Sequence, residues 1–330
     1  MVWPVFLLTI IIPSVVAIYN GTTVTDPTIY PFFVMLGNPH VCGGVIISYN
    51  PPIVLTAAHC VADAHHPSTL PLGASNPYFA GFRGTDRRKH KINRIVDWVI
   101  HPSYMDVRGE IDMHYDIALI KLHVPIEPSS SVSRVALWPE QEELINPRQG
   151  VLMGFGYLGT ADQDQANILQ QMVLDVSRFS LASQEMIEAV TPLDFGWACH
   201  GDSGSPLVVY RAIESSSGKI SFAPFAAGVL ARIFGVHDPD QTRATCPIPY
   251  KLQSKVPTII QSFCNISGAL DWISMVTGFS KETLTDPFAV PECKDNSRHT
   301  QKNGGWDQSF KTVSPLLRQA QDPACTCLLY

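Results

Sequence analysis

The stretch CHGDSGSP, Cys199–Pro206, is the most informative motif in this chain. Its centre, Gly201–Gly204, places one serine among glycines. At average residue usage, a given four-residue string occurs by chance in a chain of this length with a probability of roughly 0.002. Glycines around a serine let the backbone turn sharply and aim its N–H groups at a bound molecule. Ser203 is therefore a candidate nucleophile, provided that a base lies within hydrogen-bond reach.

Two earlier segments carry the groups that such a serine needs. TAAHC stands at Thr56–Cys60, and HYDIALIKL stands at His114–Leu122. Each key residue alone is more often structural: a histidine beside a cysteine, an aspartate before a strand, a serine in a turn. Together, a histidine can accept the serine proton and an aspartate can hold the histidine in the required tautomer. The three motifs therefore predict a catalytic triad of His59, Asp116 and Ser203.

These motifs resemble those of the trypsin-like (chymotrypsin-type) serine peptidases, and the resemblance extends from Ile18 to about Val276. The order His, Asp, Ser along the chain is the chymotrypsin order, whereas subtilisins and α/β-hydrolases carry the same groups in other orders. The resemblance implies an all-β fold of two packed antiparallel β-barrels, with the triad at their junction and a short C-terminal helix. It also implies hydrolysis of peptide bonds in protein or peptide substrates.

The resemblance assigns a role to each site residue. His59 would act as general base and acid, Asp116 would orient it, and Ser203 would form the acyl-enzyme. The backbone amides of Gly201 and Ser203 would form the oxyanion hole.

The spacing of apolar runs also favours an all-β fold. Short apolar runs alternate with turn residues, which suits a barrel or sandwich better than alternating strands and helices. A hairpin tip is predicted at Arg211–Lys219 and an amphipathic helix at Ile266–Val276. The predicted strands are Phe32–Leu36, Gly44–Ser48, Ile53–Thr56, Ile92–Ile100, Ile117–Leu122, Val151–Gly154, Gln170–Val176, Pro206–Tyr210 and Phe225–Val229.

The two ends of the chain differ in composition from its middle. Residues 1–17 carry no charge and end in Val15-Val16-Ala17, which predicts a signal peptide. An uncleaved membrane anchor is the alternative, although Pro4 and Pro13 interrupt the apolar run. We expect a peptidase domain at 18–279 and an irregular C-terminal extension at 280–330. Eight cysteines indicate disulfides formed in an oxidising compartment, and hence a secreted, extracellular protein.

Composition and spacing argue against several partners. The 330 residues carry a formal net charge of −6, which gives no basis for binding nucleic acid. His65-His66 has no partner at a zinc-like spacing, and Gly73–Asp86 lacks the glutamates of the calcium loop found in some trypsins. We therefore expect no cofactor and no metal. No later run could span a bilayer, and we expect a monomer without stable membrane association.

The resemblance also implies disulfides and a means of activation. Cys42 would pair with Cys60, and Cys199 with Cys246, with Cys264 as the alternative partner. The pairing of Cys264, Cys293, Cys325 and Cys327 stays open.

Ile18-Tyr19-Asn20-Gly21 stands where the family has its mature N-terminus, whose freed amine pairs with the aspartate before the nucleophile, here Asp202. No Arg or Lys precedes Ile18. We therefore predict that signal peptidase, cutting after Ala17, frees the activating amine itself.

Two departures from the family bear on specificity. Trp197, six residues before Ser203, stands at the base of the primary pocket, where trypsins carry an aspartate. Without a carboxylate there, a bound Arg or Lys would be a buried and unpaired cation, so we predict cleavage after non-basic residues. Gly228–Gly235, GVLARIFG, would pair with the substrate backbone. The family has Ser-Trp-Gly there, and either Ala231–Ile233 or Phe234-Gly235 replaces it.

Two other functions compete with the endopeptidase. The first is a non-catalytic homologue that binds proteins through the same cleft, although the intact triad disfavours it. The second is another serine hydrolase, such as an esterase, which would require the elbow G-x-S-x-G. Gly201–Ser205 lacks the final glycine of that pattern.

Overall fold

The computed structural model describes residues 18–38, 40–70, 75–105, 109–139, 149–159, 165–179, 186–191, 196–214, 218, 220–237, 246–250 and 259–291. The predicted signal peptide and Cys293, Cys325 and Cys327 lie outside these residues. Among the helices in these ranges, none has the length and apolar character needed to cross a membrane.

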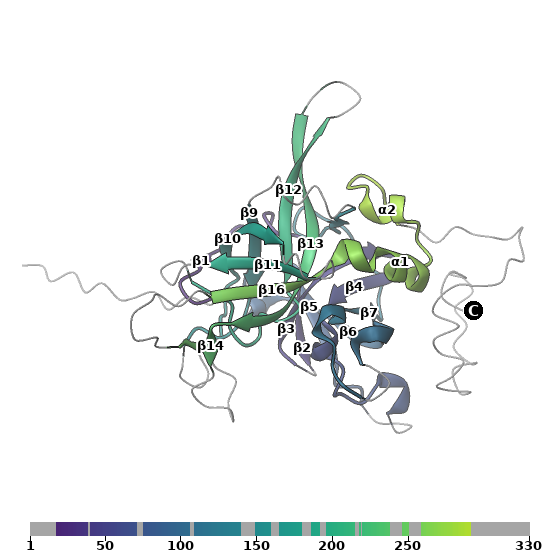
Figure 1. Cartoon of the computed structure of the whole chain (residues 1–330). Helices are drawn as coiled ribbons and strands as arrows, with labels where there is room; N and C mark the ends of the chain where they lie inside the picture. Colours follow the sequence, from purple (N-terminus) through teal and green to yellow (C-terminus); the bar gives the residue numbers. More distant parts are fainter. Residues whose placement is uncertain are drawn as a thin grey trace, which may run out of the picture.

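The N-terminal half of the domain forms a closed barrel of antiparallel strands (Figure 1). Its order is β2-β3-β4-β7-β6-β5. The strands are β2 (Phe33–Asn38), β3 (Cys42–Tyr49), β4 (Pro52–Thr56), β5 (Phe79–Phe82), β6 (Lys91–Ile100) and β7 (Ala118–Leu122). Its apolar core continues into residues of the second barrel and the C-terminal helix, including Val208, Val229 and Ile273. The two halves of the domain are therefore packed on one another.

The second half forms another ring of six antiparallel strands. Strand β9 pairs with both β10 and β12, which closes the order β9-β10-β11-β16-β13-β12. The strands are β9 (Gln149–Gly154), β10 (Gln170–Phe179), β11 (Met186–Thr191), β12 (Pro206–Glu214), β13 (Ile220–Phe234) and β16 (Ile259–Asn265). The predicted fold class, two antiparallel β-barrels, is confirmed.

Short strands complete the sheets. Strand β1 (Thr22–Thr23) pairs with β10, and β8 (Ala136–Leu137) runs parallel to β13. Strands β14 (Val236–His237) and β15 (Ile248–Pro249) form a separate two-stranded sheet.

All nine predicted strands overlap observed strands, but the predicted hairpin tip is too long. Arg211–Glu214 continues β12 and pairs with Ile220–Ala223 of β13. The two strands project from the body of the domain as a ribbon (Figure 1). The outer half of β12 alternates between exposed and partly buried residues. Backbone hydrogen bonds hold it, so no apolar pattern marks it in the sequence.

The C-terminal helix has clear end signals. Helix α1 (Ile266–Thr277) begins after Asn265, whose side chain accepts the Ser267 N–H at 3.1 Å. It ends at Gly278, whose φ of 74° is a conformation that favours glycine. The buried face of α1 includes Trp272 and Ile273, which confirms the predicted amphipathic helix.

The start of the C-terminal extension packs against the domain. Helix α2 (Lys281–Thr285) buries Leu284 completely. Arg134 donates from Nε to the carbonyl of Ala289 at 2.7 Å and from Nη2 to the carbonyl of Asp286. Residues 280–291 are thus held on the surface of the barrels, next to β8.

Candidate active site

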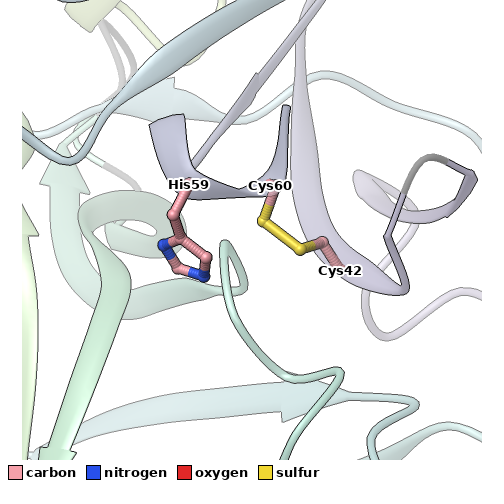
Figure 2. Close-up of side chains that lie close together, drawn as sticks. All are labelled: Cys42, His59 and Cys60. Atoms are coloured by element: carbon pink, nitrogen blue, oxygen red, sulfur yellow. A yellow bond between two sulfur atoms is a disulfide. The ribbon is translucent and has the colours of Figure 1, made fainter. Parts of the chain in front are cut away.

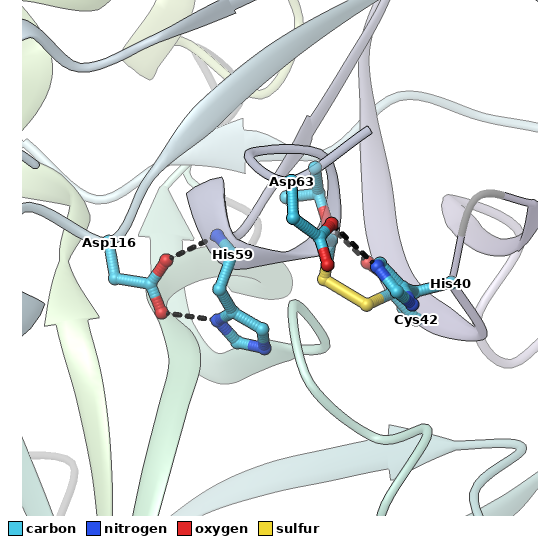
Figure 3. The surroundings of a disulfide bond; sticks show 8 residues. His40, Cys42, His59, Asp63 and Asp116 are labelled. Atoms are coloured by element: carbon cyan, nitrogen blue, oxygen red, sulfur yellow. Dashed lines mark hydrogen bonds and ion pairs between the residues drawn. A yellow bond between two sulfur atoms is a disulfide. The ribbon is translucent and has the colours of Figure 1, made fainter. Parts of the chain in front are cut away.

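Strand pairing brings His59 and Asp116 together. His59 lies on the 3-10 turn Ala58–Cys60 just after β4, and Asp116 lies just before β7. These strands pair with Thr56 opposite Ala118. Asp116 Oδ1 accepts the backbone N–H of His59 at 2.8 Å, and Oδ2 lies 2.6 Å from His59 Nδ1 (Figure 3). The carboxylate is fully buried, whereas the His59 side chain is 30% exposed.

This geometry sets the tautomer of the ring. A proton on Nδ1 is held by the buried carboxylate, so Nε2 is left as an acceptor toward the exposed side. A neutral imidazole with a free Nε2 can accept a proton from a nearby hydroxyl.

The turn that carries Ser203 lies against the segment that carries His59. The Ser203 carbonyl accepts the N–H of Gly43 at 2.7 Å. Gly204 has a φ of 76°, and a Cβ there would lie 2.3 Å from Thr56 Oγ1 and 2.6 Å from the Gly43 carbonyl. The residue after Ser203 therefore touches a residue three positions before His59, and only glycine fits there.

A disulfide holds the same neighbourhood together. Cys42, next to Gly43, is bonded to Cys60, next to His59, as the resemblance implied (Figure 2). The ligand atoms of Cys42, His59 and Cys60 lie within 4.8 Å of one another. Because the two sulfurs are bonded to each other, they offer no thiolates to a metal ion.

An ion pair lies on the outer side of this disulfide. His40 Nε2 and Asp63 Oδ1 are 2.7 Å apart, with side chains 49% and 72% exposed (Figure 3). An exposed pair of this kind contributes little to stability.

Gly201 and Ser203 each carry a backbone N–H in the turn that leads to the proposed nucleophile. Gly201 has a φ of 89°, and a Cβ there would lie 3.1 Å from Gly156 Cα. In the part of the chain that the structure describes, the amides of Gly201 and Ser203 donate to no other residue. Backbone N–H groups that point at the same place can stabilise an oxyanion, and these two amides are the candidates for that role.

Asp202 is a buried carboxylate with neutral partners. Its side chain is fully buried, and it accepts the N–H of Gly156 at 2.8 Å and of Cys199 at 2.9 Å. Burial raises the pKa of Asp202 to about 7, although the two N–H groups act to lower it. Among the described residues, no cation contributes to the environment of this carboxylate in the form of the chain in which a residue precedes Ile18.

The segment at Ile18 lies close to the chain that leads to Asp202. Ile18 is fully buried in the core of the second barrel, with a φ of 51°. The carbonyl of the next residue, Tyr19, accepts the N–H of Trp197 at 3.2 Å. Gly196 contacts the same carbonyl so closely that a Cβ would lie 1.9 Å from it. The Ile18 segment is thus already seated inside the domain.

The indole of Trp197 is buried in a small apolar cluster separate from the core of the second barrel. It is 4% exposed, stacks on the Tyr19 ring at 4.0 Å between centroids, and donates from Nε1 to the Pro247 carbonyl at 2.9 Å. It packs in one cluster with Cys199 and Cys246, which form a disulfide, as the resemblance implied. Cys264, the alternative partner, instead donates to the carbonyl of His114 at 3.1 Å.

The register of β13 decides how Gly228–Gly235 lies. Leu230 accepts the N–H of Gly204 at 2.8 Å and donates to the Ser205 carbonyl at 2.9 Å. Ala231-Arg232-Ile233 therefore follows directly after the residue that contacts the Ser203 turn. Sequence reasoning assigned no role to Arg232. One of the two possible alignments of this segment with the family's Ser-Trp-Gly includes Arg232, and that was a sequence signal that could have pointed to this residue.

Two packed antiparallel barrels, with a His–Asp pair beside a Gly-Asp-Ser-Gly turn, define the chymotrypsin class of double-barrel proteins. The family model described as trypsin matches residues 18–234, more than half of the chain. The chain therefore belongs to the trypsin family.

Three curated relatives are distantly similar. The chain is 28% identical to the human transmembrane protease serine 5 over 186 residues, which cover 53% of this chain and 38% of that protein. It is 26% identical to a trypsin of Simulium vittatum over 206 residues, 57% of this chain and 77% of the relative. It is 27% identical to the Drosophila melanogaster serine protease Hayan over 213 residues, 59% and 31% respectively. The match thus spans well under half the length of two of these relatives.

Proposed function

We propose that this chain is a secreted endopeptidase that hydrolyses peptide bonds through an acyl-enzyme on Ser203. The observation that carries the proposal is the 2.6 Å contact between His59 Nδ1 and the buried Asp116 carboxylate. This pairing fixes the ring tautomer that a general base needs. Contact of Gly204 with Thr56 supports a position of Ser203 next to His59.

The proposed reaction has two halves. Ser203 Oγ attacks the substrate carbonyl carbon while His59 Nε2 takes the hydroxyl proton, and Asp116 stabilises the imidazolium. The N–H groups of Gly201 and Ser203 hold the oxyanion, and each such donor is worth about 3–4 kcal/mol in the transition state. His59 then gives the proton to the leaving amine. Water, activated by the same imidazole, hydrolyses the ester to a carboxylic acid and frees Ser203.

One chain contains every group that this reaction uses. We therefore propose a monomer acting on protein or peptide substrates, with a peptidase domain at 18–279 and an extension at 280–330. The steps require neither a metal nor a cofactor.

We further propose that cleavage after Ala17 both completes export and activates the enzyme. The buried position of Ile18 and the unneutralised Asp202 carboxylate support this. A free Ile18 ammonium beside Asp202 would supply the missing cation, because a buried carboxylate is strongly stabilised by an ion partner. N-terminal sequencing of the active secreted protein tests this, and active material that begins at another residue would contradict it.

The proposed primary specificity is for non-basic residues. Trp197 brings no carboxylate to the pocket base, and its indole is held by Tyr19 and Pro247. A cleavage profile dominated by Arg and Lys would overturn this part of the proposal.

A fluorophosphonate probe tests the catalytic function directly. The mature protein should be labelled at Ser203, and Ser203→Ala should lose both labelling and peptide hydrolysis, the latter by around 10⁶-fold. A folded protein that binds peptides but is neither labelled nor active would instead favour the non-catalytic homologue.

A further inference from the structure

Arg232 lies beside the nucleophile turn. It stands on β13, two residues after Leu230, whose carbonyl accepts the N–H of Gly204 at 2.8 Å. Gly204 directly follows Ser203. Because a strand rises about 3.3 Å per residue, the Arg232 backbone is within about 7 Å of Leu230 along the strand. A long side chain at this position can reach a peptide bound at Ser203.

Arg232 and Ile233 lie on opposite faces of β13. Ile233 packs against the cluster of Trp197, Cys199 and Cys246. Successive residues of a strand point to opposite faces, so Arg232 and Phe234 lie on the face away from that cluster. Phe234 is 40% exposed, and the Arg232 guanidinium carbon lies 4.5 Å from the centroid of its ring. A cation is thus held over a partly exposed aromatic ring.

Within the residues that the structure describes, the Arg232 guanidinium has no hydrogen-bond partner, and its Nε is buried. The nearby acidic group is Asp112, four residues before Asp116. Its Oδ1 already accepts the His114 N–H at 3.0 Å and lies 2.6 Å from His114 Nδ1. Burial acts to raise the pKa of Asp112, but His114 hydrogen bonds and the Arg232 charge lower it overall. The N–H donors on the two Nη atoms of the guanidinium are therefore left for another acceptor.

We infer that Arg232 is a specificity-determining residue that binds an acidic substrate side chain on the amino side of the cleaved bond. The resemblance to the family puts the base of the primary pocket at Trp197, against whose cluster Ile233 packs. A substrate residue that entered there would leave the preceding substrate residues to pass along β13 beside Arg232. A carboxylate matches the fork of donors on a guanidinium, whereas a neutral amide of the same shape does not. This inference rests on the proposed peptidase function and names the substrate class.

Paired peptides test the inference. Two sets of peptides carry Glu or Gln at one of the three positions from two to four residues before the cleaved bond, and are otherwise identical. At one of these positions the wild type should show a kcat/KM about fivefold to tenfold higher for Glu, with a ratio that falls as salt is added. Arg232→Gln should bring the ratio to about one, and Arg232→Glu should reverse it.

Arg211→Gln is the matched control. Arg211 also lies over an aromatic ring, with its guanidinium carbon 5.8 Å from the Trp138 centroid, but on β12 five residues beyond Pro206. Its loss should leave the Glu/Gln ratio unchanged. Equal rates for Glu and Gln at all three positions in the wild type, or a ratio that Arg232→Gln does not alter, would overturn the inference.

A binding assay separates this inference from the function on which it rests. Labelling of Ser203 by the fluorophosphonate shows whether the protein is an active peptidase, independently of Arg232. Anisotropy of the labelled Glu and Gln peptides with Ser203→Ala then measures recognition without turnover. If labelling fails, a preference for Glu in this assay still supports the role of Arg232, and equal affinities contradict it.

Discussion

Asp202 and Gly156 are packed so closely that a Cβ on Gly156 would lie 2.4 Å from Asp202 Oδ2. The same glycine donates its N–H to Oδ1 at 2.8 Å. The carboxylate next to the proposed nucleophile is therefore enclosed by backbone, and the protein has placed a group with a strong need for a cation where water cannot reach it.

The first prediction concerns pH and the form that retains residues before Ile18. Burial raises the pKa of Asp202 from 3.8 to about 7 in the folded chain, so the folded state holds this proton more tightly than the unfolded state. The contribution of this proton to the free energy of unfolding should be largest below about pH 4. It should be lost as the pH rises to 7, which lowers the free energy of unfolding by roughly 4 kcal/mol in all. Urea unfolding at a series of pH values measures this.

Two controls accompany that measurement. Asp202→Asn has no proton to lose there, so this part of the pH dependence should disappear, whatever its overall stability. The form that begins at Ile18 should also lack the decline, because an ammonium partner keeps Asp202 ionised. A decline of equal size in all three proteins would show that other groups cause it.

The second prediction concerns Asp116. Asp116→Asn should lower kcat by about 10⁴-fold, because an amide in place of the carboxylate favours the wrong ring tautomer. Asp112→Asn is the control, since that carboxylate contacts His114 and not His59. Steady-state kinetics and circular dichroism measure activity and fold together. Similar losses in the two folded variants would contradict the role given to Asp116.

The third prediction concerns Gly204. Gly204→Ala should abolish activity or prevent folding, because the new methyl group would overlap Thr56 and the Gly43 carbonyl. Gly109→Ala is the control: its φ of 81° is similar, but no atom of the described residues lies within 4 Å of its Cβ position. It should cost only about 1–2 kcal/mol of backbone strain. Thermal unfolding of both variants decides the point, and equal costs would show that the contacts with Thr56 and Gly43 matter little.

The fourth prediction concerns Trp197. Trp197→Ala should lower the free energy of unfolding by about 3–5 kcal/mol, since it empties a buried site next to the Cys199–Cys246 disulfide. Trp197→Phe keeps a ring that can stack on Tyr19 and loses only the hydrogen bond to Pro247, so it should cost much less. Chemical unfolding of the two variants checks this order. A cost for Trp197→Phe as large as for Trp197→Ala would contradict it.

Recurring apolar residues predicted most of the strands, but strands that depend mainly on backbone hydrogen bonds were not predicted. Strand β5, with the sequence FAGF, is too short for a clear pattern, and the outer parts of β12 and β13 contain only exposed or partly buried residues, so they have no buried apolar face. Backbone hydrogen bonds between distant segments stabilise these strands, and such bonds leave little trace in local composition. Helix α2 was missed for the related reason that one buried residue, Leu284, anchors it.

The sequence indicated the family, the barrel class and the candidate triad, because motifs such as TAAHC and GDSG are short, local and rare. The resemblance implied the Cys42–Cys60 disulfide, but it left Cys264 as an alternative to Cys246 as the partner of Cys199. Three contacts became visible in the tertiary structure alone. His59 Nδ1 contacts the buried Asp116 carboxylate, Trp197 stacks on Tyr19, and Arg232 lies beside the Ser203 turn. The physical reason is that each of these contacts joins residues far apart in the chain. Strand register and burial determine which of these residues come into contact and which lose access to water. Neither register nor burial can be predicted from one segment of the sequence alone.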